Sequence, residues 1–219
     1  MNRRPIQRIA FAGAVMGAFA FTACAEKQQE AAGTTQDQHE GMDHGNMDHS
    51  GMNHGQMTAQ EVVETPDYTS VAAPVKAQVA ALVDSYLKLK DALVASDSQA
   101  AKAAAESVLA AAEKIDLAAL EGEQQAFAED KLEEVRQSAS SVAAAGDVSA
   151  QRESLELLSE ATFSLTKAFG ATDQKLYYQH CPMASNNQGA YWLSSSPEIR
   201  NPYFGEQMLK CGSTEEVLN

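Results

Sequence analysis

Residues 74–94, PVKAQVAALVDSYLKLKDALV, decide the expected fold class because their apolar residues recur at helical spacing. Alternating steps of four and three residues separate Val75, Val79, Leu82, Tyr86, Leu89 and Leu93. This spacing lines one face of an α-helix with apolar side chains. The stretch therefore predicts a helix with one buried face.

The same spacing continues as far as Phe169 and predicts three further helices. The second begins at Ser96, which is placed to form a capping box with Gln99, and the fourth follows a break at Gly146 and Asp147. Gly170 is placed to end the fourth helix. Their expected buried positions are Ala101, Ala105, Val108, Ala112 and Ile115, then Ala128, Leu132, Val135, Ala139 and Val142, then Val148, Leu155, Leu158, Thr162, Leu165 and Phe169.

Short connections between these helices favour an up-down four-helix bundle over residues 70–170. The remaining residues, 171–219, hold six of the aromatic residues together with Asn-Asn and Asn-Pro pairs, which is typical of a loop-rich segment. We expect an all-α fold in which this irregular C-terminal Cys/Met segment packs on the bundle as part of the same domain.

The N-terminal residues 1–23 have the pattern of a bacterial lipoprotein signal peptide. Three arginines precede the apolar run Ile9 to Phe21, which is too short to span a bilayer as a helix. The run leads to Thr22-Ala23-Cys24, and small residues before a cysteine resemble a lipobox, in which Cys24 carries the lipid. The alternative is an ordinary signal peptide that is cleaved near Ala23. We expect a lipid-anchored protein on the periplasmic face of the bacterial envelope, with the outer membrane favoured over the inner.

Residues 24–69 are polar, and we predict a flexible Met/His-rich tether. Within this tether a unit of Met, Asp or Asn, and His repeats every five residues. Methionine thioether suits Cu(I) and Ag(I), while imidazole suits copper in both oxidation states. The sequence thus predicts weak, exchangeable metal sites, against the alternative of a polar linker with accidental ligands. The ligands would be Met42, His44, Met47, His49, Met52, His54 and Met57.

A second group of soft ligands lies near the C-terminus, at His180-Cys181-Pro182-Met183 and Met208-Leu209-Lys210-Cys211. Thiols and thioethers together suit Cu(I) or Ag(I), with His180 as an additional nitrogen ligand. The alternative is a structural disulfide between Cys181 and Cys211, which an oxidising compartment favours. The ligand spacing leaves both interpretations open, and the two states could alternate with redox conditions.

Charge and motif content exclude several functions. The chain has 219 residues, with 16 Lys and Arg against 30 Asp and Glu, giving a net charge of −14. Loss of residues 1–23 removes three arginines and no acid, so the mature charge would be −17. A strongly acidic chain without a basic cluster is not expected to bind nucleic acid. Only His180 lies outside the tether, and there is no phosphate-binding glycine loop or haem motif, so we predict no enzyme.

Several motifs resemble a bacterial domain family of unknown function. They are Tyr178 to Ala184 (YQHCPMA), Gly189 to Ser194 (GAYWLS), Glu198 to Gly205 (EIRNPYFG) and Met208 to Gly212 (MLKCG), with Tyr86 to Leu93 (YLKLKDAL) and Gln151-Arg152-Glu153 earlier. The resemblance covers about residues 70–216. That domain also occurs fused to the C-terminus of periplasmic adaptor subunits of Cus-type copper/silver efflux systems. The Cys-Pro-Met core is similar to short heavy-metal-binding modules of such exporters.

The resemblance implies a helical envelope domain associated with copper or silver handling. By position, Cys181, Met183, Met208 and Cys211 match the family's Cys-Pro-Met and Met-x-x-Cys motifs. No adaptor hairpin or barrel precedes the domain in this chain. We therefore expect a lipoprotein that binds copper or silver ions for sequestration or for transfer to a heavy-metal efflux adaptor. The alternative is a disulfide-closed helical interaction domain, with a structural role, on a membrane tether.

Overall fold

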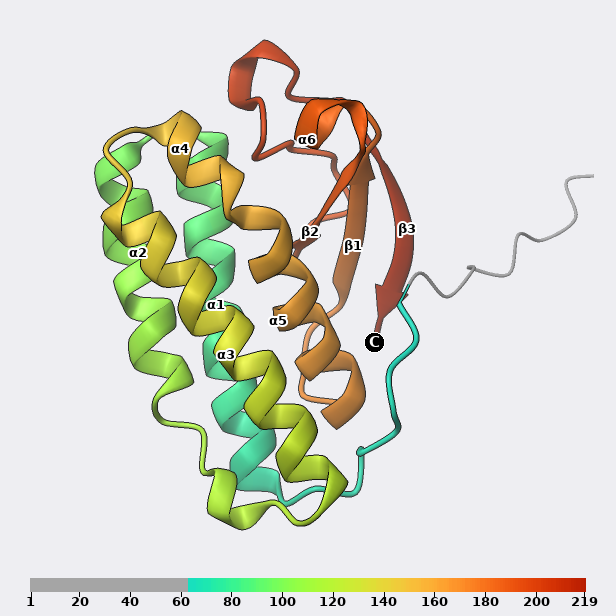
Figure 1. Ribbon diagram of the computed structural model, residues 1–219. Helices are drawn as coiled ribbons and strands as arrows, with labels where there is room; N and C mark the ends of the chain where they lie inside the picture. The colour runs from blue at the N-terminus through green and yellow to red at the C-terminus, as the bar shows by residue number, and fades with distance from the viewer. Residues whose placement is uncertain (1–62) are drawn as a thin grey trace, which may run out of the picture. The chain divides into compact units, whose positions relative to one another are not determined.

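The computed structural model describes residues 63–219, which form helices followed by a small sheet (Figure 1). The predicted signal peptide and the predicted tether residues before Val63 lie outside the described part. The helical elements are α1 (Ala73–Val94), α2 (Ser98–Ala112), η1 (Leu117–Ala119), α3 (Glu123–Ala144), α4 (Val148–Glu153), α5 (Leu155–Phe169), α6 (Ala184–Asn187) and η2 (Gly205–Gln207). The strands are β1 (Leu176–Cys181), β2 (Ala190–Ser194) and β3 (Ser213–Leu218).

The helical spacing correctly predicted the core of the helical layer. All six apolar residues that define the face of α1, from Val75 to Leu93, are fully buried. Helix α3 buries its five predicted positions, and α2 buries Ala101, Ala105 and Val108. Alanines at these contacts allow the helices to pack closely. In Figure 1, α1, α2, α3 and α5 run side by side, and each packs against two of the others.

The ends of the helices confirm two sequence predictions and correct two others. Asp147 caps α4 through hydrogen bonds from the N–H groups of Ser149 and Ala150, and Gly170 ends α5 in the left-handed conformation. Asp97, not Ser96, caps α2, because its carboxylate accepts hydrogen bonds from the second and third N–H groups of that helix. The predicted fourth helix is divided at Ser154 into α4 and α5.

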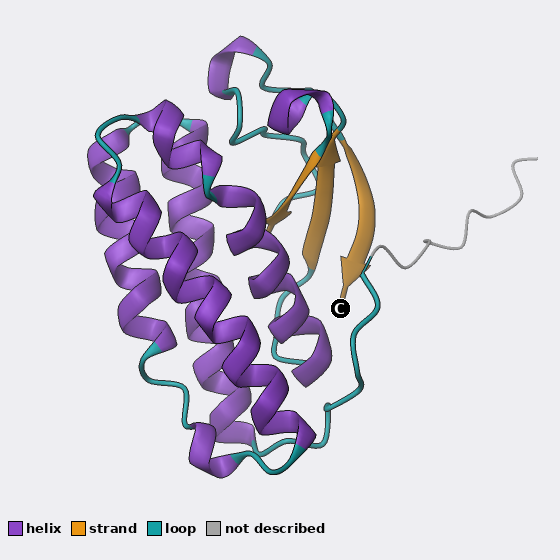
Figure 2. Cartoon of the chain, in the orientation of Figure 1, coloured by secondary structure: helices purple, strands orange, loops and turns teal. Residues whose placement is uncertain are grey.

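The prediction of an all-α fold is wrong. In the C-terminal part, three antiparallel strands form a sheet in the order β2-β1-β3, so the described domain is mixed α/β (Figure 2). The tyrosines of β1 and the Tyr and Trp of β2 favour strands, because aromatic side chains fit a pleated, half-buried surface. Tyr178 lies opposite Leu193 in β2, and Gln179 lies opposite Trp192. The segment predicted to be irregular therefore contains the sheet that holds the candidate ligands.

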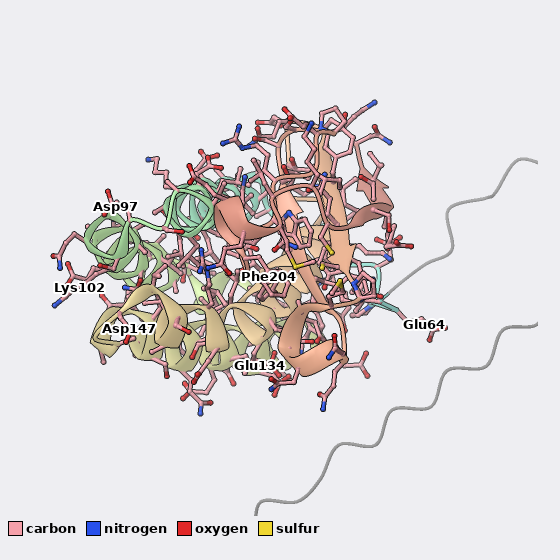
Figure 3. All side chains as sticks on the ribbon, turned by 90° about the horizontal axis from the view of Figure 1, so that it is seen from above. Glu64, Asp97, Lys102, Glu134, Asp147 and Phe204 are labelled. Atoms are coloured by element: carbon pink, nitrogen blue, oxygen red, sulfur yellow. The ribbon has the colours of Figure 1, made fainter. Side chains whose placement is uncertain are left out.

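The sheet has two covered faces, because successive side chains on a strand point in opposite directions. On the first face, Tyr178 stacks on Phe163 of α5 with ring centroids 3.9 Å apart, and Leu193 joins the helical core. On the second face, Cys181 and Trp192 form a smaller cluster that Phe204 packs against. In the view from above, Asp97 and Lys102 lie at the outer edge of the helices, whereas Phe204 lies toward the sheet (Figure 3). The second face of the sheet is the one that carries the cysteines.

Arg152 ties the C-terminal segment to the helical layer. Its Nε donates to the carbonyl oxygen of Pro202 at 2.7 Å, and its Nη2 donates to the carbonyl oxygen of Leu93 at 2.8 Å and to Ser96 Oγ at 2.9 Å. Desolvation by burial lowers the pKa of the guanidinium. The resemblance had singled out Arg152 only as part of a motif, and the structure gives it a connecting role.

Replacing Arg152 with methionine is expected to lower the free energy of unfolding by about 2–3 kcal/mol, because a charged donor of three hydrogen bonds is lost. Urea unfolding of the full chain measures the change. Arg136→Met is the matched control, because Arg136 pairs only with Glu133 on the exposed surface of α3 and should change stability by about 0.5 kcal/mol or less. Equal losses in the two variants would contradict the connecting role of Arg152.

Candidate functional site

The β1–β3 pairing brings Cys181 and Cys211 together although 30 residues separate them in the sequence. Cys181 is the last residue of β1 and is fully buried, and Cys211 is partly buried two residues before β3. His180 lies opposite Ser213, so continuing the antiparallel register places Cys181 opposite Gly212. Both cysteines are free thiols, and Cys211 packs against the buried cluster that contains Cys181. Thus the register of the sheet positions the pair.

Asn201 holds the backbone of the second cysteine in place. Its Nδ2 donates to the carbonyl oxygen of Cys211 at 2.9 Å, and its backbone N–H donates to the carbonyl oxygen of Leu209 at 2.9 Å. Its Oδ1 accepts from the N–H of Tyr203 at 2.8 Å. Sequence reasoning did not assign Asn201 a role, although an asparagine before a proline is a known turn signal.

The environment of Cys211 favours its protonated form. Its hydrogen bond with Cys181 raises the pKa of the Cys211 thiol, and burial and the charge of Cys181 raise it further. The N–H of Met183, which hydrogen-bonds to the same sulfur, has the opposite effect. A metal ion that binds here must therefore displace protons from thiols.

Met183, a third predicted ligand, follows Cys181 by two residues, and its thioether stays a predicted ligand. Its backbone N–H contacts Cys211, and its side chain is 46% exposed, although methionine is an apolar residue. Ser185, Asn186 and Asn187, which follow it, all have positive φ values of 48°, 58° and 65°. Such a run is costly for residues with side chains, so the loop between β1 and β2 holds a strained backbone. Ser185 Oγ donates to Glu156 Oε2 at 2.8 Å and fixes this loop to α5.

His180 does not lie with the cysteines, because it is on the opposite face of β1 from Cys181. Its ring stacks on Tyr191 with centroids 4.3 Å apart. It also lies over Gly189, where an added Cβ would be 2.3 Å from His180 Nε2. His180 is thus packed as part of an aromatic stack and is separated from the thiol pair.

Met208 contacts the site through its backbone, since its carbonyl oxygen accepts from the N–H of Cys211 at 3.0 Å. Its side chain is partly buried, and its thioether stays a predicted ligand only. The predicted lipid anchor and tether ligands lie outside the described residues, at Cys24, Met42, His44, Met47, His49, Met52, His54 and Met57.

Trp192 forms the wall of the cysteine cluster and was not predicted as a site residue. It is fully buried beside Cys181, and an added Cβ on Gly212 would be 2.8 Å from its Cη2 atom. Its Nε1 has no hydrogen-bond partner among the described residues. Its ring also packs edge-on against Tyr203, with centroids 6.1 Å apart. A bulky, rigid residue thus limits the space around the thiols.

Two further properties of residues 63–219 bear on the predictions. Within that range no group of three or more His, Cys, Asp and Glu side chains could hold a metal ion. None of the helices described in that range has the length and apolar character needed to cross a membrane.

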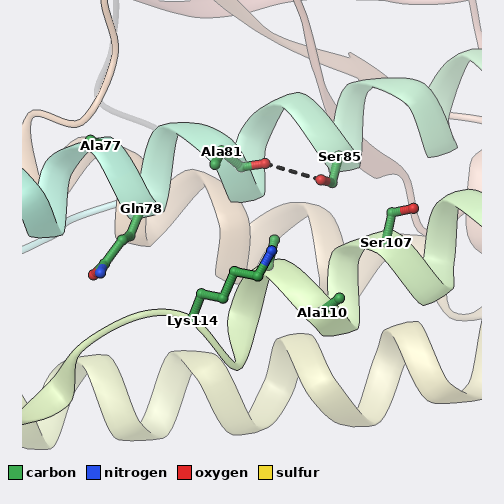
Figure 4. A pocket seen from close by; sticks show the side chains of 8 residues that line it. Ala77, Gln78, Ala81, Ser85, Ser107, Ala110 and Lys114 are labelled. Atoms are coloured by element: carbon green, nitrogen blue, oxygen red, sulfur yellow. Dashed lines mark hydrogen bonds between the residues drawn. The ribbon is translucent and has the colours of Figure 1, made fainter.

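A surface groove of about 470 Å³ lies between α1 and α2, away from the cysteines (Figure 4). Its walls carry Gln78 and Ser85 from α1 and Lys114 from the end of α2, with alanines between them. None of its lining residues is a Cys, Met or His. The groove therefore offers no ligands for a soft metal.

Comparison with known proteins gave one match. Residues 82–174 match a family described as "Protein of unknown function (DUF3347)". The match covers α2 to α5 and most of α1, but it ends before β1, so it includes neither cysteine of the pair. No curated protein and no solved structure matches the chain. The helical part of this chain is thus similar to an uncharacterised domain family.

Proposed function

We propose that this protein is an envelope-anchored lipoprotein that binds soft heavy-metal ions, Cu(I) or Ag(I) and, in the tether, Cu(II). It would sequester these ions or transfer them to a heavy-metal efflux system. The observation that carries the proposal is the packing of Cys211 against the buried cluster that contains Cys181, at the end of β1.

Two adjacent thiols suit a soft cation for a simple reason. After both lose their protons, two thiolates more than balance the charge of a monovalent ion and can bind it from two sides, and Cu(I) accepts this low coordination number. Thiolate and thioether ligands select Cu(I) over hard cations. The exposed thioether of Met183 adds a third soft ligand close to the surface, where an ion arrives. Hard cations would find no carboxylate cluster here among residues 63–219.

The tether and the anchor would supply the other parts of the function. Seven Met and His ligands in residues 42–57 would collect ions weakly and raise their concentration near the thiol pair. Lipidation at Cys24 would hold the whole chain at the envelope. The proposed efflux partner rests on the resemblance of the C-terminal motifs to domains fused to efflux adaptors.

A disulfide-closed interaction domain is the second candidate, and the same packing favours it. Thiols that pack in one cluster can be oxidised to a bridge, which in the chain-entropy model would stabilise a loop of this size by about 3–4 kcal/mol. Thiol counting after aerobic purification separates the candidates. A bridge that forms completely and that Cu(I) or Ag(I) never prevents would favour the structural function.

The test of metal binding is a competition titration under anaerobic, reducing conditions. The full chain and a tether variant, in which the seven tether ligands are replaced by Leu and Asn, are titrated with Cu(I) against a Cu(I)-specific chelator. We expect the tether variant to lose weak sites and to keep one tight site. A reduced chain that holds no copper against the chelator would contradict the proposal.

Replacing Met183 with leucine is expected to weaken that tight site about tenfold, equivalent to about 1.4 kcal/mol, because a thioether ligand is lost. Leucine has a similar volume and the side chain is half exposed, so the free energy of unfolding should stay within about 0.5 kcal/mol of wild type. The same titration and a urea melt measure the two quantities. An unchanged affinity would remove Met183 from the ligand set.

A further inference from the structure

We infer that the Cys181–Cys211 pair also reduces Cu(II), giving two electrons to two Cu(II) ions as the thiols become a disulfide. This inference rests on the proposed function, because it assigns the copper-binding pair a second reaction. It means that the oxidation state of the supplied copper decides the outcome: Cu(I) is bound by the pair, and Cu(II) is reduced by it.

The geometry favours a reaction within one chain. Cys211 packs against the buried cluster that contains Cys181, and the continued register places Cys181 opposite Gly212, so the two thiols lie on neighbouring backbone segments of one chain. The β1–β3 ladder fixes one side of the pair, and Asn201 fixes the other through the carbonyl oxygen of Cys211. Holding two reactants together in this way replaces a bimolecular encounter by an intramolecular step.

Burial sets the order of events. Cys181 is fully buried and Cys211 is partly exposed, so Cys211 is the sulfur that a dissolved ion reaches first. Cu(II) binds this sulfur and displaces its proton, and one electron passes from sulfur to copper. The sulfur of Cys181 then bonds to that of Cys211, and the second electron passes to a second Cu(II).

The reaction balances in atoms and electrons. Two S–H bonds break, one S–S bond forms, and two protons leave to solvent, while two Cu(II) ions become two Cu(I) ions. The disulfide has lost both thiolate ligands, so the Cu(I) formed must move to thioethers. Met183, two residues after Cys181 in the chain, offers such a group at the surface, since the residue is 46% exposed. Each chain reacts once, because nothing in the reaction restores the thiols.

The experiment uses the full chain with Cys24→Ser, so that the pair carries its only thiols. Reduced protein is mixed anaerobically with excess CuCl₂ and a chromophoric Cu(I)-specific chelator, and remaining thiols are alkylated and counted by mass spectrometry. We expect two Cu(I) per chain, an intramolecular bridge between Cys181 and Cys211, and a rate that is first order in protein. Retention of both thiols with no Cu(I) formed would overturn the inference.

Single-cysteine variants are the controls. In Cys211→Ser or Cys181→Ser, a lone thiol can be oxidised only by pairing with another chain, so reduction should slow at least tenfold, become second order in protein and yield dimers. Single variants as fast as the pair would also overturn the inference. Cys211→Ser is the safer variant because its site is partly exposed, and a urea melt checks that each variant is folded.

Failure of the Cu(II)-reduction inference can be distinguished from failure of the proposed Cu(I)-binding function. If the reduced pair holds Cu(I) against the chelator but leaves Cu(II) unreduced, only the inference fails. If Cu(II) is reduced with the expected stoichiometry but Cu(I) is not held, the inference stands as chemistry of the pair and the proposed binding function fails.

Discussion

Replacing Cys181 and Cys211 together with serine is expected to weaken the tight Cu(I) site by about a thousandfold, equivalent to about 4 kcal/mol. Serine hydroxyls stay protonated and are hard ligands, so the variant loses both soft anions that neutralise the ion. Competition titration of the full chain, with tether ligands replaced so that only this site is measured, gives the affinity.

The matched control for the cysteine variant is Met208→Leu, because Met208 meets Cys211 through its backbone carbonyl oxygen, which the substitution keeps. We expect it to weaken binding less than Met183→Leu does. The double serine variant must first be shown to be folded by its urea transition, since Cys181 is fully buried. A folded double variant that still binds Cu(I) as tightly as wild type would exclude the pair as the site.

Replacing Tyr178 with alanine is expected to lower the free energy of unfolding by about 3–5 kcal/mol. Its ring is almost fully buried between Phe163 of α5, 3.9 Å away between centroids, and Tyr191 of β2, 5.0 Å away. It therefore joins the sheet to the helical layer, and burial raises the pKa of its phenol. Urea unfolding, followed by near-UV circular dichroism, measures the loss.

Tyr177→Ala is the control for Tyr178, since the neighbouring tyrosine has the same chemistry but points to the other face of β1 and is only partly buried. It should cost about 1 kcal/mol or less. If the two substitutions cost the same, the stack of Tyr178 on Phe163 does not hold the sheet on the helices.

The helices were predictable because apolar residues recur at helical spacing over many turns. In α1 a single spacing rule identifies six buried residues over five turns, and the same rule holds for α3. The cap of α2 was misplaced by one residue because Ser96 and Asp97 are both good caps, and only the backbone decides between them. Ser96 has a φ of 55°, which leaves Asp97 to accept the N–H groups.

The sheet was missed because its strands are short and both faces are covered. In β1 the buried positions do not alternate with exposed ones, since Tyr178, Gln179 and Cys181 are all buried. A strand covered on both faces lacks the period-two signal that marks a half-exposed strand. The aromatic residues from Tyr177 to Trp192 were a usable signal of strand propensity, but turn residues around them favoured a loop.

The sequence predicted only part of the candidate site, because the sheet that arranges its residues was missed. Sequence spacing identified Cys181, Met183 and Cys211 as soft ligands, and the β1–β3 register explains why they meet. The sequence spacing also grouped His180 with these ligands, because His180 is next to Cys181 in the chain. In a β-strand, successive side chains point to opposite faces, so the two side chains are separated. Trp192 and Asn201 have no ligand chemistry of their own, so only the fold shows their roles.

The most direct test of the central claim is X-ray absorption spectroscopy at the copper edge. The sample is the reduced, full-length tether variant loaded with one equivalent of Cu(I). The account predicts a Cu(I) edge and a first coordination shell of sulfur alone, from Cys181, Cys211 and Met183. A first shell made of nitrogen or oxygen would contradict it, and so would a spectrum that the double serine variant reproduces.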